Sequence, residues 1–239
     1  MKKASPSSGP GSVLRPMDPT AALPVHERLK VHEIFYSIQG ESTFAGRPCV
    51  LVRLTGCQMR CSWCDTEHAF HQGSWMSREQ ILEAVAAFNC PLVELTGGEP
   101  LLQPAAFDLL RDLCDAGYEV LLETGGGVDI GPVDARVRRI VDVKCPSSGE
   151  LEGNHWPNLE KLRSTDEVKF VVADRRDYEL ACDVVRKYAL AERCPVHVSP
   201  VHGAVNLQEL AQWILQDRLG MRMQLQMHKF IWSPETRGV

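Results

Sequence analysis

The sequence lacks the features of membrane, secreted and nucleic-acid-binding proteins. No apolar run approaches the ~20 residues that a membrane helix needs. Lys2 and Lys3 are followed by Pro, Ser and Gly and not by an apolar core, so the N-terminus does not resemble a secretory signal. The net charge is −5, and no basic block follows the first few residues. We therefore expect a cytoplasmic protein without a membrane or nucleic-acid partner.

Cysteine is not scarce, but its arrangement argues against a disulfide framework. The chain has nine cysteines, which is an odd number, and three of them are clustered. This pattern favours a reducing compartment and a metal centre. No second C-x2-C and no H-x3-H pair is present to build the other half of an ordinary zinc ribbon. The unclustered cysteines are interpreted as buried, unligated, small apolar residues: Cys49, Cys90, Cys114, Cys145, Cys182 and Cys194.

Strand, polar turn and helix recur along most of the chain. The strand-like runs are 29–36, 49–54, 92–95, 119–123, 139–144, 168–172, 195–199 and, more weakly, 221–227. The helical patterns are 77–88, 104–116, 175–188 and 207–219. Such an alternation is typical of βα units with a parallel sheet. We predict an α/β fold, namely a partial (truncated) TIM-like βα barrel with a mostly parallel sheet and poor helical cover around 125–165.

The chain is predicted to form one domain behind a tail. Residues 1–26 are rich in Ser, Pro, Gly and Ala without periodicity, which predicts a disordered tail. Residues 27–239 form the predicted domain. Its Gly-rich and polar turns follow the strands, and barrel enzymes place their chemistry at this carboxyl edge.

Three cysteines, Cys57, Cys61 and Cys64, have the spacing C-x3-C-x2-C directly after the run 49–54. Iron–sulfur cubes are usually held by four cysteines, so three would leave one iron without a protein ligand. An open coordination position is the mark of a reactive metal site. A zinc site is the alternative, because His68 or His71 would complete a Cys3His tetrahedron.

The turn Thr96-Gly97-Gly98-Glu99-Pro100 follows the next predicted strand. Two glycines allow a backbone to approach a ligand closely, because no Cβ intervenes. A Gly-Gly pair alone is equally consistent with an ordinary turn. Because the cysteine loop lies one βα unit earlier, we expect the two motifs to face each other across the barrel mouth.

These motifs together, with Trp63 before the last cysteine, resemble the radical S-adenosylmethionine superfamily. The resemblance implies that the cysteines hold one 4Fe–4S cluster per chain. It also implies that S-adenosyl-L-methionine binds the fourth iron and is cleaved by one electron to a 5′-deoxyadenosyl radical. The Gly-Gly segment would bind the amino group of this cofactor.

The sequence is further similar to the 7-carboxy-7-deazaguanine synthase family over about residue 30 to the C-terminus. The segments that carry this similarity are 35–41, 53–57, 64–66, 142–149 and 228–231. The resemblance implies a lyase that converts 6-carboxy-5,6,7,8-tetrahydropterin to 7-carboxy-7-deazaguanine with release of ammonia, on the route to 7-deazapurines such as queuosine. It also implies Mg2+ dependence, a homodimer, and a reducing partner such as flavodoxin or ferredoxin.

The resemblance also implies roles for individual residues, although none is assigned as catalytic beyond the cluster and cofactor. The pterin would be contacted by Ile38, Gln39, Gly40, Arg53 and Thr96. The S-adenosylmethionine pocket would be lined by Trp63, Cys64, Asp65, Gly98, Lys144, Pro146, Ser147 and Ser148. Thr66 would bind Mg2+.

Elementary chemistry supports some of these roles and offers alternatives. The fork of Arg53 suits a substrate carboxylate, whereas a surface ion pair is its alternative role. Thr66 would otherwise be a helix cap. Glu41 and Glu99 are further candidates for the pterin edge, or else solvated turn carboxylates. Ser147 and Ser148 would otherwise be ordinary turn residues.

Two other functions fit parts of the pattern. A glycyl-radical-enzyme activating enzyme would share the three-cysteine loop but act on a protein, whereas Arg53, the Gln39 turn and Thr66 favour a small carboxylated substrate. A zinc-stabilised binding module is the second alternative.

Overall fold

The computed structural model describes residues 23–24, 27–233 and 236–238. Nearly all of the predicted tail, 1–22 and 25–26, lies outside the described residues. In the described part, nine strands form one sheet in the order β3-β1-β2-β4-β5-β6-β7-β8-β9. They are β1 (Arg28–Ile38), β2 (Pro48–Leu54), β3 (Ser74–Ser77), β4 (Leu92–Gly97), β5 (Glu119–Thr124), β6 (Arg138–Val143), β7 (Glu167–Val172), β8 (Val196–Pro200) and β9 (Arg222–Met223).

The sheet is mostly parallel, as predicted. β1 pairs antiparallel with both β2 and β3, whereas every pair from β2–β4 to β8–β9 is parallel. Each predicted strand has a counterpart, but the weak run 221–227 is reduced to β9. The short strand β3 was not predicted, because its sequence Ser-Trp-Met-Ser has no alternation of apolar and polar residues.

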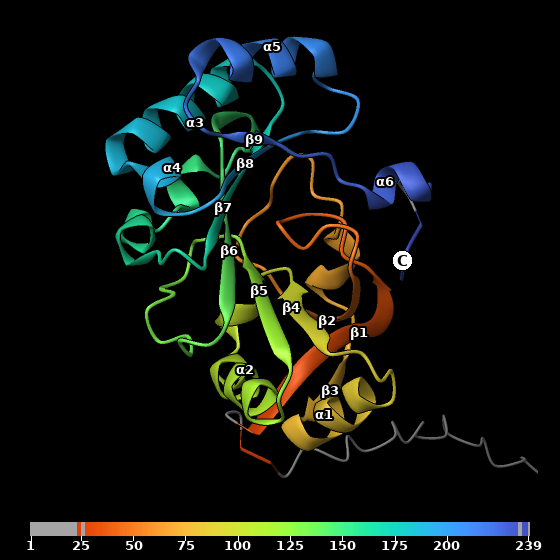
Figure 1. The fold of residues 1–239 in the computed structure, drawn as a ribbon. Helices are drawn as coiled ribbons and strands as arrows, with labels where there is room; N and C mark the ends of the chain where they lie inside the picture. Colours follow the sequence, from red (N-terminus) through yellow and green to blue (C-terminus); the bar gives the residue numbers. More distant parts are fainter. Residues whose placement is uncertain (1–22, 25–26, 234–235, 239) are drawn as a thin grey trace, which may run out of the picture.

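Helices cover the sheet unevenly (Figure 1). They are α1 (Arg78–Ala86), α2 (Ala105–Asp115), α3 (Arg175–Tyr188), α4 (Leu190–Arg193), α5 (Leu207–Asp217) and α6 (His228–Ile231). A capping box at Ser77 begins α1: the hydroxyl accepts from the Gln80 N–H, and the Gln80 side chain accepts from the Ser77 N–H. Between β5 and β7 the described chain forms β6 and 3-10 turns but no α-helix, so the prediction of poor cover around 125–165 is confirmed.

Burial of the central strands explains their composition. Val50, Val52 and Leu54 of β2 are fully buried, as are Leu92 and Leu95 of β4. Parallel strands covered on both faces need such continuous apolar runs. The other cysteines agree with this pattern, since five of the six outside the loop are buried. The exception is Cys114 in α2, which is unligated and packs against the core but is only half-buried.

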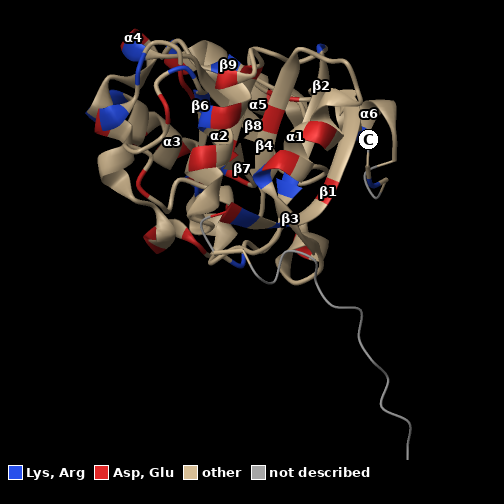
Figure 2. Cartoon of the chain, turned by 90° about the horizontal axis from the view of Figure 1, so that it is seen from below, with Lys and Arg blue, Asp and Glu red and all other residues tan. Residues whose placement is uncertain are grey.

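Charged side chains of both signs lie on the helices at the surface of the protein. Figure 2 shows acidic and basic residues interspersed over the helices seen from below. Some form pairs along one helix, such as Arg175 with Glu179 at 3.0 Å and Arg111 with Asp108 at 2.9 Å. Exposed pairs of this kind contribute little to stability. None of the described helices is long and apolar enough to cross a membrane.

The barrel is incomplete, and the C-terminal segment crosses its open side. β3 and β9 are the two edges of the sheet, and they do not pair with each other. After β9 the chain runs back to the loop that follows β1 (Figure 1). There the Gln224 amide donates to the Ser42 carbonyl at 2.8 Å, and the Met227 N–H donates to the Gly40 carbonyl at 3.0 Å. Side-chain and backbone hydrogen bonds thus replace strand pairing at this gap.

Candidate active site

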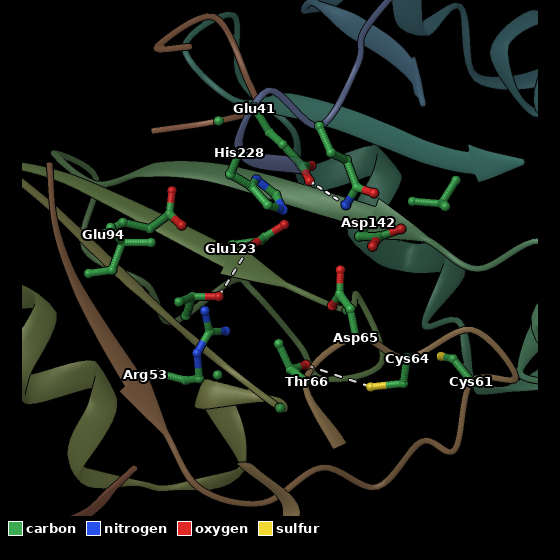
Figure 3. A pocket seen from close by; sticks show the side chains of 18 of the residues that line it. Glu41, Arg53, Cys61, Cys64, Asp65, Thr66, Glu94, Glu123, Asp142 and His228 are labelled. Carbon is green, nitrogen blue, oxygen red and sulfur yellow. Dashed lines mark hydrogen bonds between the residues drawn. The ribbon is translucent and has the colours of Figure 1, made fainter. Parts of the chain in front are cut away.

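A cavity of about 610 Å3 opens at the carboxyl ends of the parallel strands. Most of the residues predicted for the site line it: Ile38, Gln39, Gly40, Arg53, Cys57, Cys61, Trp63, Cys64, Asp65, Thr66, Thr96, Gly98 and Lys144. Figure 3 shows Cys61 and Cys64 on one side of this space and Arg53 and Glu94 on the other. The fold therefore brings together residues that are more than a hundred positions apart in the sequence.

The three cysteines lie on one loop between β2 and a 3-10 turn, η2 (Glu67–Phe70). All three are free and half-buried. The loop is fixed at both ends, because the Gly56 N–H donates to the Ala69 carbonyl at 2.9 Å and the Glu99 N–H donates to the Gly56 carbonyl at 2.8 Å. Three thiols on a fixed loop facing one cavity fit a cube that lacks a fourth protein ligand.

The arrangement does not fit the zinc alternative. Ligand atoms of a tetrahedral zinc site lie within about 4 Å of one another. Within the described residues, one group of at least three His, Cys, Asp or Glu side chains has ligand atoms that all lie within 4.8 Å of one another. This group consists of His32, Glu33 and His68. His68 therefore groups with His32 and Glu33 and does not complete a site with the cysteines.

The Gly-Gly turn packs directly against the cysteine loop, so the two motifs are neighbours and do not face each other across the barrel mouth as predicted. A Cβ at Gly98 would lie 2.3 Å from the Gly56 carbonyl oxygen and 2.7 Å from the Cys57 Cβ. Glycine is therefore required here by the loop itself, in addition to any ligand. The carboxyl end of β4 thus fixes the position of Cys57 at the cavity.

Pro146, Ser147 and Ser148 form a 3-10 turn, η4 (Pro146–Ser148), behind the loop. The Ser148 carbonyl accepts from the Ser62 N–H at 3.0 Å, and the Ser147 carbonyl accepts from the Ser62 hydroxyl at 2.8 Å. The turn braces the cysteine loop, and the three residues are not among those that line the cavity. Their contact with S-adenosylmethionine stays a prediction.

Arg53 lies at the end of β2, next to Thr96 in the register of the sheet. Its Nε donates to Glu33 Oε1 at 2.8 Å, and its side chain is only 15% exposed. The alternative of a surface ion pair is therefore wrong, because the pair is half-buried and lines the cavity. Within the described residues only Nε of this guanidinium is hydrogen-bonded, so the two terminal nitrogens are free for a ligand carboxylate.

Thr66 lies beside the last cysteine. Its hydroxyl is 3.6 Å from Cys64 Sγ and makes no capping hydrogen bond to the 3-10 turn that it precedes. The alternative role as a side-chain cap is therefore wrong. Its oxygen faces the cavity, where it is available to a cation.

The predictions missed a buried network of charges. Lys169 of β7 lies 2.7 Å from Glu41, 2.5 Å from Glu123 and 3.7 Å from Asp142. Burial would lower the pKa of Lys169, but these carboxylates outweigh it and raise the pKa well above its ordinary range. Burial would likewise raise the pKa of Glu123, but Lys169 lowers it to about 2. The cavity wall therefore carries fixed charges of both signs.

The pKa of Glu94 is shifted in the opposite direction to that of Glu123. It is buried in β4 and accepts a hydrogen bond from the Gln39 amide. Burial, and then repulsion by Glu123, raises the pKa of Glu94 well above its ordinary value. The neutral form of this carboxyl is therefore favoured over the charged form. An ionisable residue inside an apolar strand, such as Glu94 or Lys169, was the signal in the sequence for this network, because it must face other polar groups.

The two further glutamates predicted for the pterin edge differ. Glu99 is buried and accepts hydrogen bonds from the Leu101 N–H, the Thr124 hydroxyl and the Gly125 N–H. It is neither a solvated turn carboxylate nor free for a ligand, since it ties the ends of β4 and β5 together. Glu41 lines the cavity and binds Lys169.

The C-terminal segment covers part of the cavity and was not assigned from the sequence. His228 packs on Gly40, where a Cβ would lie 2.5 Å from His228 Nδ1. Lys229 pairs with Asp65 of the cysteine loop at 2.8 Å. The segment therefore joins the loop after β1 to the cysteine loop.

Comparison with known proteins agrees with this geometry. The Radical SAM superfamily profile matches residues 51–147. The crystal structure of QueE from Escherichia coli superposes with a TM-score of 0.69 at 23% identity, over 84% of this chain and 95% of that chain. An incomplete α/β barrel with a three-cysteine loop at its mouth defines a radical S-adenosylmethionine enzyme, which uses a 4Fe–4S cluster and S-adenosyl-L-methionine.

Two relatives define the family more narrowly. The 7-carboxy-7-deazaguanine synthase of Chlorobaculum tepidum is 48% identical over 88% of this chain and 97% of its own length. That of Koribacter versatilis is 44% identical over 88% of this chain and 100% of its own length. The chain belongs to the 7-carboxy-7-deazaguanine synthase family. This membership decides against the activating enzyme and the zinc-stabilised module.

Gly98→Ala should reduce cluster loading, because the new Cβ meets backbone at 2.3 Å and must displace the loop that carries Cys57. Iron and sulfide per chain after anaerobic reconstitution measure this effect. Gly125→Ala is the matched control, since its Cβ would make only ordinary contacts of 3.4 Å and longer. Equal iron in both variants would contradict the packing argument.

Glu94→Gln should stabilise the protein more as the pH rises. Because the folded pKa of Glu94 is raised, its contribution to stability is full below the unfolded value of 4.5 and is lost as the pH increases. Glutamine still accepts from Gln39 but does not titrate. The difference in thermal midpoint between Glu94→Gln and wild type should widen from about pH 5 to about pH 8. The exposed Glu179→Gln serves as control, and a pH-independent difference at Glu94 would refute a raised pKa of this carboxyl.

Proposed function

We propose that the cavity binds S-adenosyl-L-methionine and 6-carboxy-5,6,7,8-tetrahydropterin side by side, and that the chain catalyses the family reaction. This reaction converts the pterin to 7-carboxy-7-deazaguanine with release of ammonia, in queuosine biosynthesis. The observation that carries the proposal is that Arg53, near the end of β2, and the three cysteines, on the loop after β2, open onto one cavity. When bound, the cluster and its cofactor supply the radical that starts the reaction.

The cysteines Cys57, Cys61 and Cys64 hold the cluster. Asp65, Trp63, Gly98 and Lys144 line the same end of the cavity and bind S-adenosylmethionine. Lys144 lies 2.9 Å from Asp142, which holds its ammonium in place. The turn of Pro146, Ser147 and Ser148 keeps the cysteine loop in position from behind, and these residues are proposed to contact S-adenosylmethionine when it is bound.

The pterin occupies the other end. Arg53 binds the substrate carboxylate through its two free terminal nitrogens, while Glu33 fixes the plane of the guanidinium through Nε. Ile38, Gln39, Gly40 and Thr96 line the wall on which the ring lies.

The Thr96 hydroxyl donates to Glu123 at 3.1 Å, so the hydroxyl oxygen remains available as an acceptor.

Thr66 supplies one oxygen to Mg2+. A hydroxyl is a weak ligand, so substrate oxygens and water must complete the octahedron. The hydroxyl of Thr66, which is hydrogen-bonded to Cys64 Sγ at 3.6 Å, would hold the cation between the cluster and the pterin ends of the cavity.

The enzyme acts on a small molecule and needs a reductant. The reductant is a flavodoxin or a ferredoxin, the chain forms a homodimer, and it works in the cytoplasm. The free state of all nine cysteines supports a reducing compartment, and the exposed Phe230 and Ile231 on α6 support a protein interface. Sedimentation of the purified chain checks the dimer, and a monomer would contradict it.

The direct test is anaerobic reconstitution with the pterin, S-adenosylmethionine and a chemical reductant, without a second protein. We expect 7-carboxy-7-deazaguanine as product. Arg53→Lys loses the paired hydrogen bonds and should raise KM for the pterin by roughly tenfold or more, with little change in KM for S-adenosylmethionine. Arg47→Lys, an exposed pair with Glu119, is the control. Equal loss of both affinities would refute the carboxylate role of Arg53.

Thr66→Ala tests the magnesium site. The variant should retain its iron but need more Mg2+ for half-maximal activity, because one ligand of the octahedron is lost. Thr43→Ala, whose hydroxyl binds Glu167 away from the cysteines, is the control. An unchanged Mg2+ titration would show that Thr66 is not a ligand.

A further inference from the structure

A second group of potential metal ligands lies at the rim of the cavity. His32, Glu33 and His68 each present one ligand atom, and these atoms all lie within 4.8 Å of one another. Glu33 and His68 line the cavity, with side chains 22% and 13% exposed. The two imidazole rings have their centroids 4.9 Å apart. The family reaction as argued above makes no use of either histidine.

A β-bulge in β1 brings the first two of these residues together. Val31 pairs with Leu54 and Glu33 pairs with Arg53, so two steps along β1 oppose one step along β2. In a regular strand Val31 and Glu33 would share a face, and neighbouring residues such as His32 and Glu33 would point to opposite faces. The bulge instead leaves Val31 in the core and turns Glu33 towards the cavity beside His32. Bulges re-aim side chains in this way next to functional sites.

The two histidines are held by the surrounding backbone. His32 Nδ1 lies 3.1 Å from the Gln72 carbonyl. Because a carbonyl only accepts, Nδ1 carries the hydrogen and Nε2 keeps its lone pair. Such a carbonyl partner orients many histidine ligands of metals. His68 lies in η2, whose turn is closed by the Ala69 N–H donating to the Thr66 carbonyl at 2.9 Å.

We propose that His32, Glu33 and His68 form a binding site for one divalent transition-metal cation. Two imidazoles and one carboxylate suit Zn2+ and its neighbours in the first row. Mg2+ is not the cation expected here, since it prefers oxygen ligands in an octahedron. Three protein ligands leave a fourth position for water or another small ligand.

The site is coupled to Arg53 through a shared carboxylate. Glu33 Oε1 accepts from Arg53 Nε at 2.8 Å, so a bound cation shares Glu33 with Arg53 or displaces it. Metal binding at the rim therefore alters the guanidinium that lines the cavity. The site itself is defined by the three ligands and does not depend on what Arg53 binds.

The test uses the cluster-loaded enzyme, equilibrated anaerobically with buffered Zn2+ in the presence of excess Mg2+. Iron and zinc per chain are measured in the same sample, and X-ray absorption at the zinc edge reports the ligand shell. We expect one zinc per chain, unchanged iron, and a shell of nitrogen and oxygen without sulfur. His32→Ala and His68→Ala should each weaken zinc binding by roughly tenfold or more, since each removes one of three ligands.

His71→Ala is the matched control, because His71 is an exposed histidine beside the same turn and outside the ligand group. It should bind zinc like the wild type. If a histidine variant loses iron or stability, Glu33→Gln replaces it, since glutamine keeps the shape and removes the charge. No zinc in the wild type, equal binding in all variants, or sulfur in the zinc shell would each overturn the proposal.

Discussion

The close contact between the end of β4 and the cysteine loop is the constraint on which the rest of the site depends. Gly98 lies against the Gly56 carbonyl, and the neighbouring Glu99 N–H donates to that same carbonyl. The Glu99 carboxylate, in turn, binds the end of β5. Two parallel strands thereby hold one loop, and all three thiols face the cavity. A loop anchored in this way can present an inorganic centre without using a fourth side chain.

The opposite wall is built from ionisable residues at inward-facing positions of parallel strands. Lys169 neutralises the carboxylates around it, whereas burial raises the pKa of Glu94, which lacks a cation at hydrogen-bond distance. Burying these groups is costly unless they pair, so the wall forms one connected network. Because its members come from different strands, the network also ties the open barrel together across the cavity.

The sequence allowed the parallel sheet and most of the cavity lining to be predicted, for two different physical reasons. Apolar runs such as 49–54 have few alternatives to a buried strand, and the thiol spacing of Cys57, Cys61 and Cys64 has few uses besides a metal centre. Long-range contacts were not predictable. The pairing of Lys229 with Asp65 and the packing of His228 on Gly40 depend on how the C-terminal segment crosses the open barrel, which no local pattern specifies.

The central claim is that the protein leaves one iron of the cluster without a side-chain ligand. Mössbauer spectra of protein reconstituted with 57Fe, recorded with and without S-adenosyl-L-methionine, test it most directly. The account predicts that the signal of one iron in four changes when the cofactor is added, while the other three remain as they were. A spectrum in which all four irons are unaffected by the cofactor would contradict it.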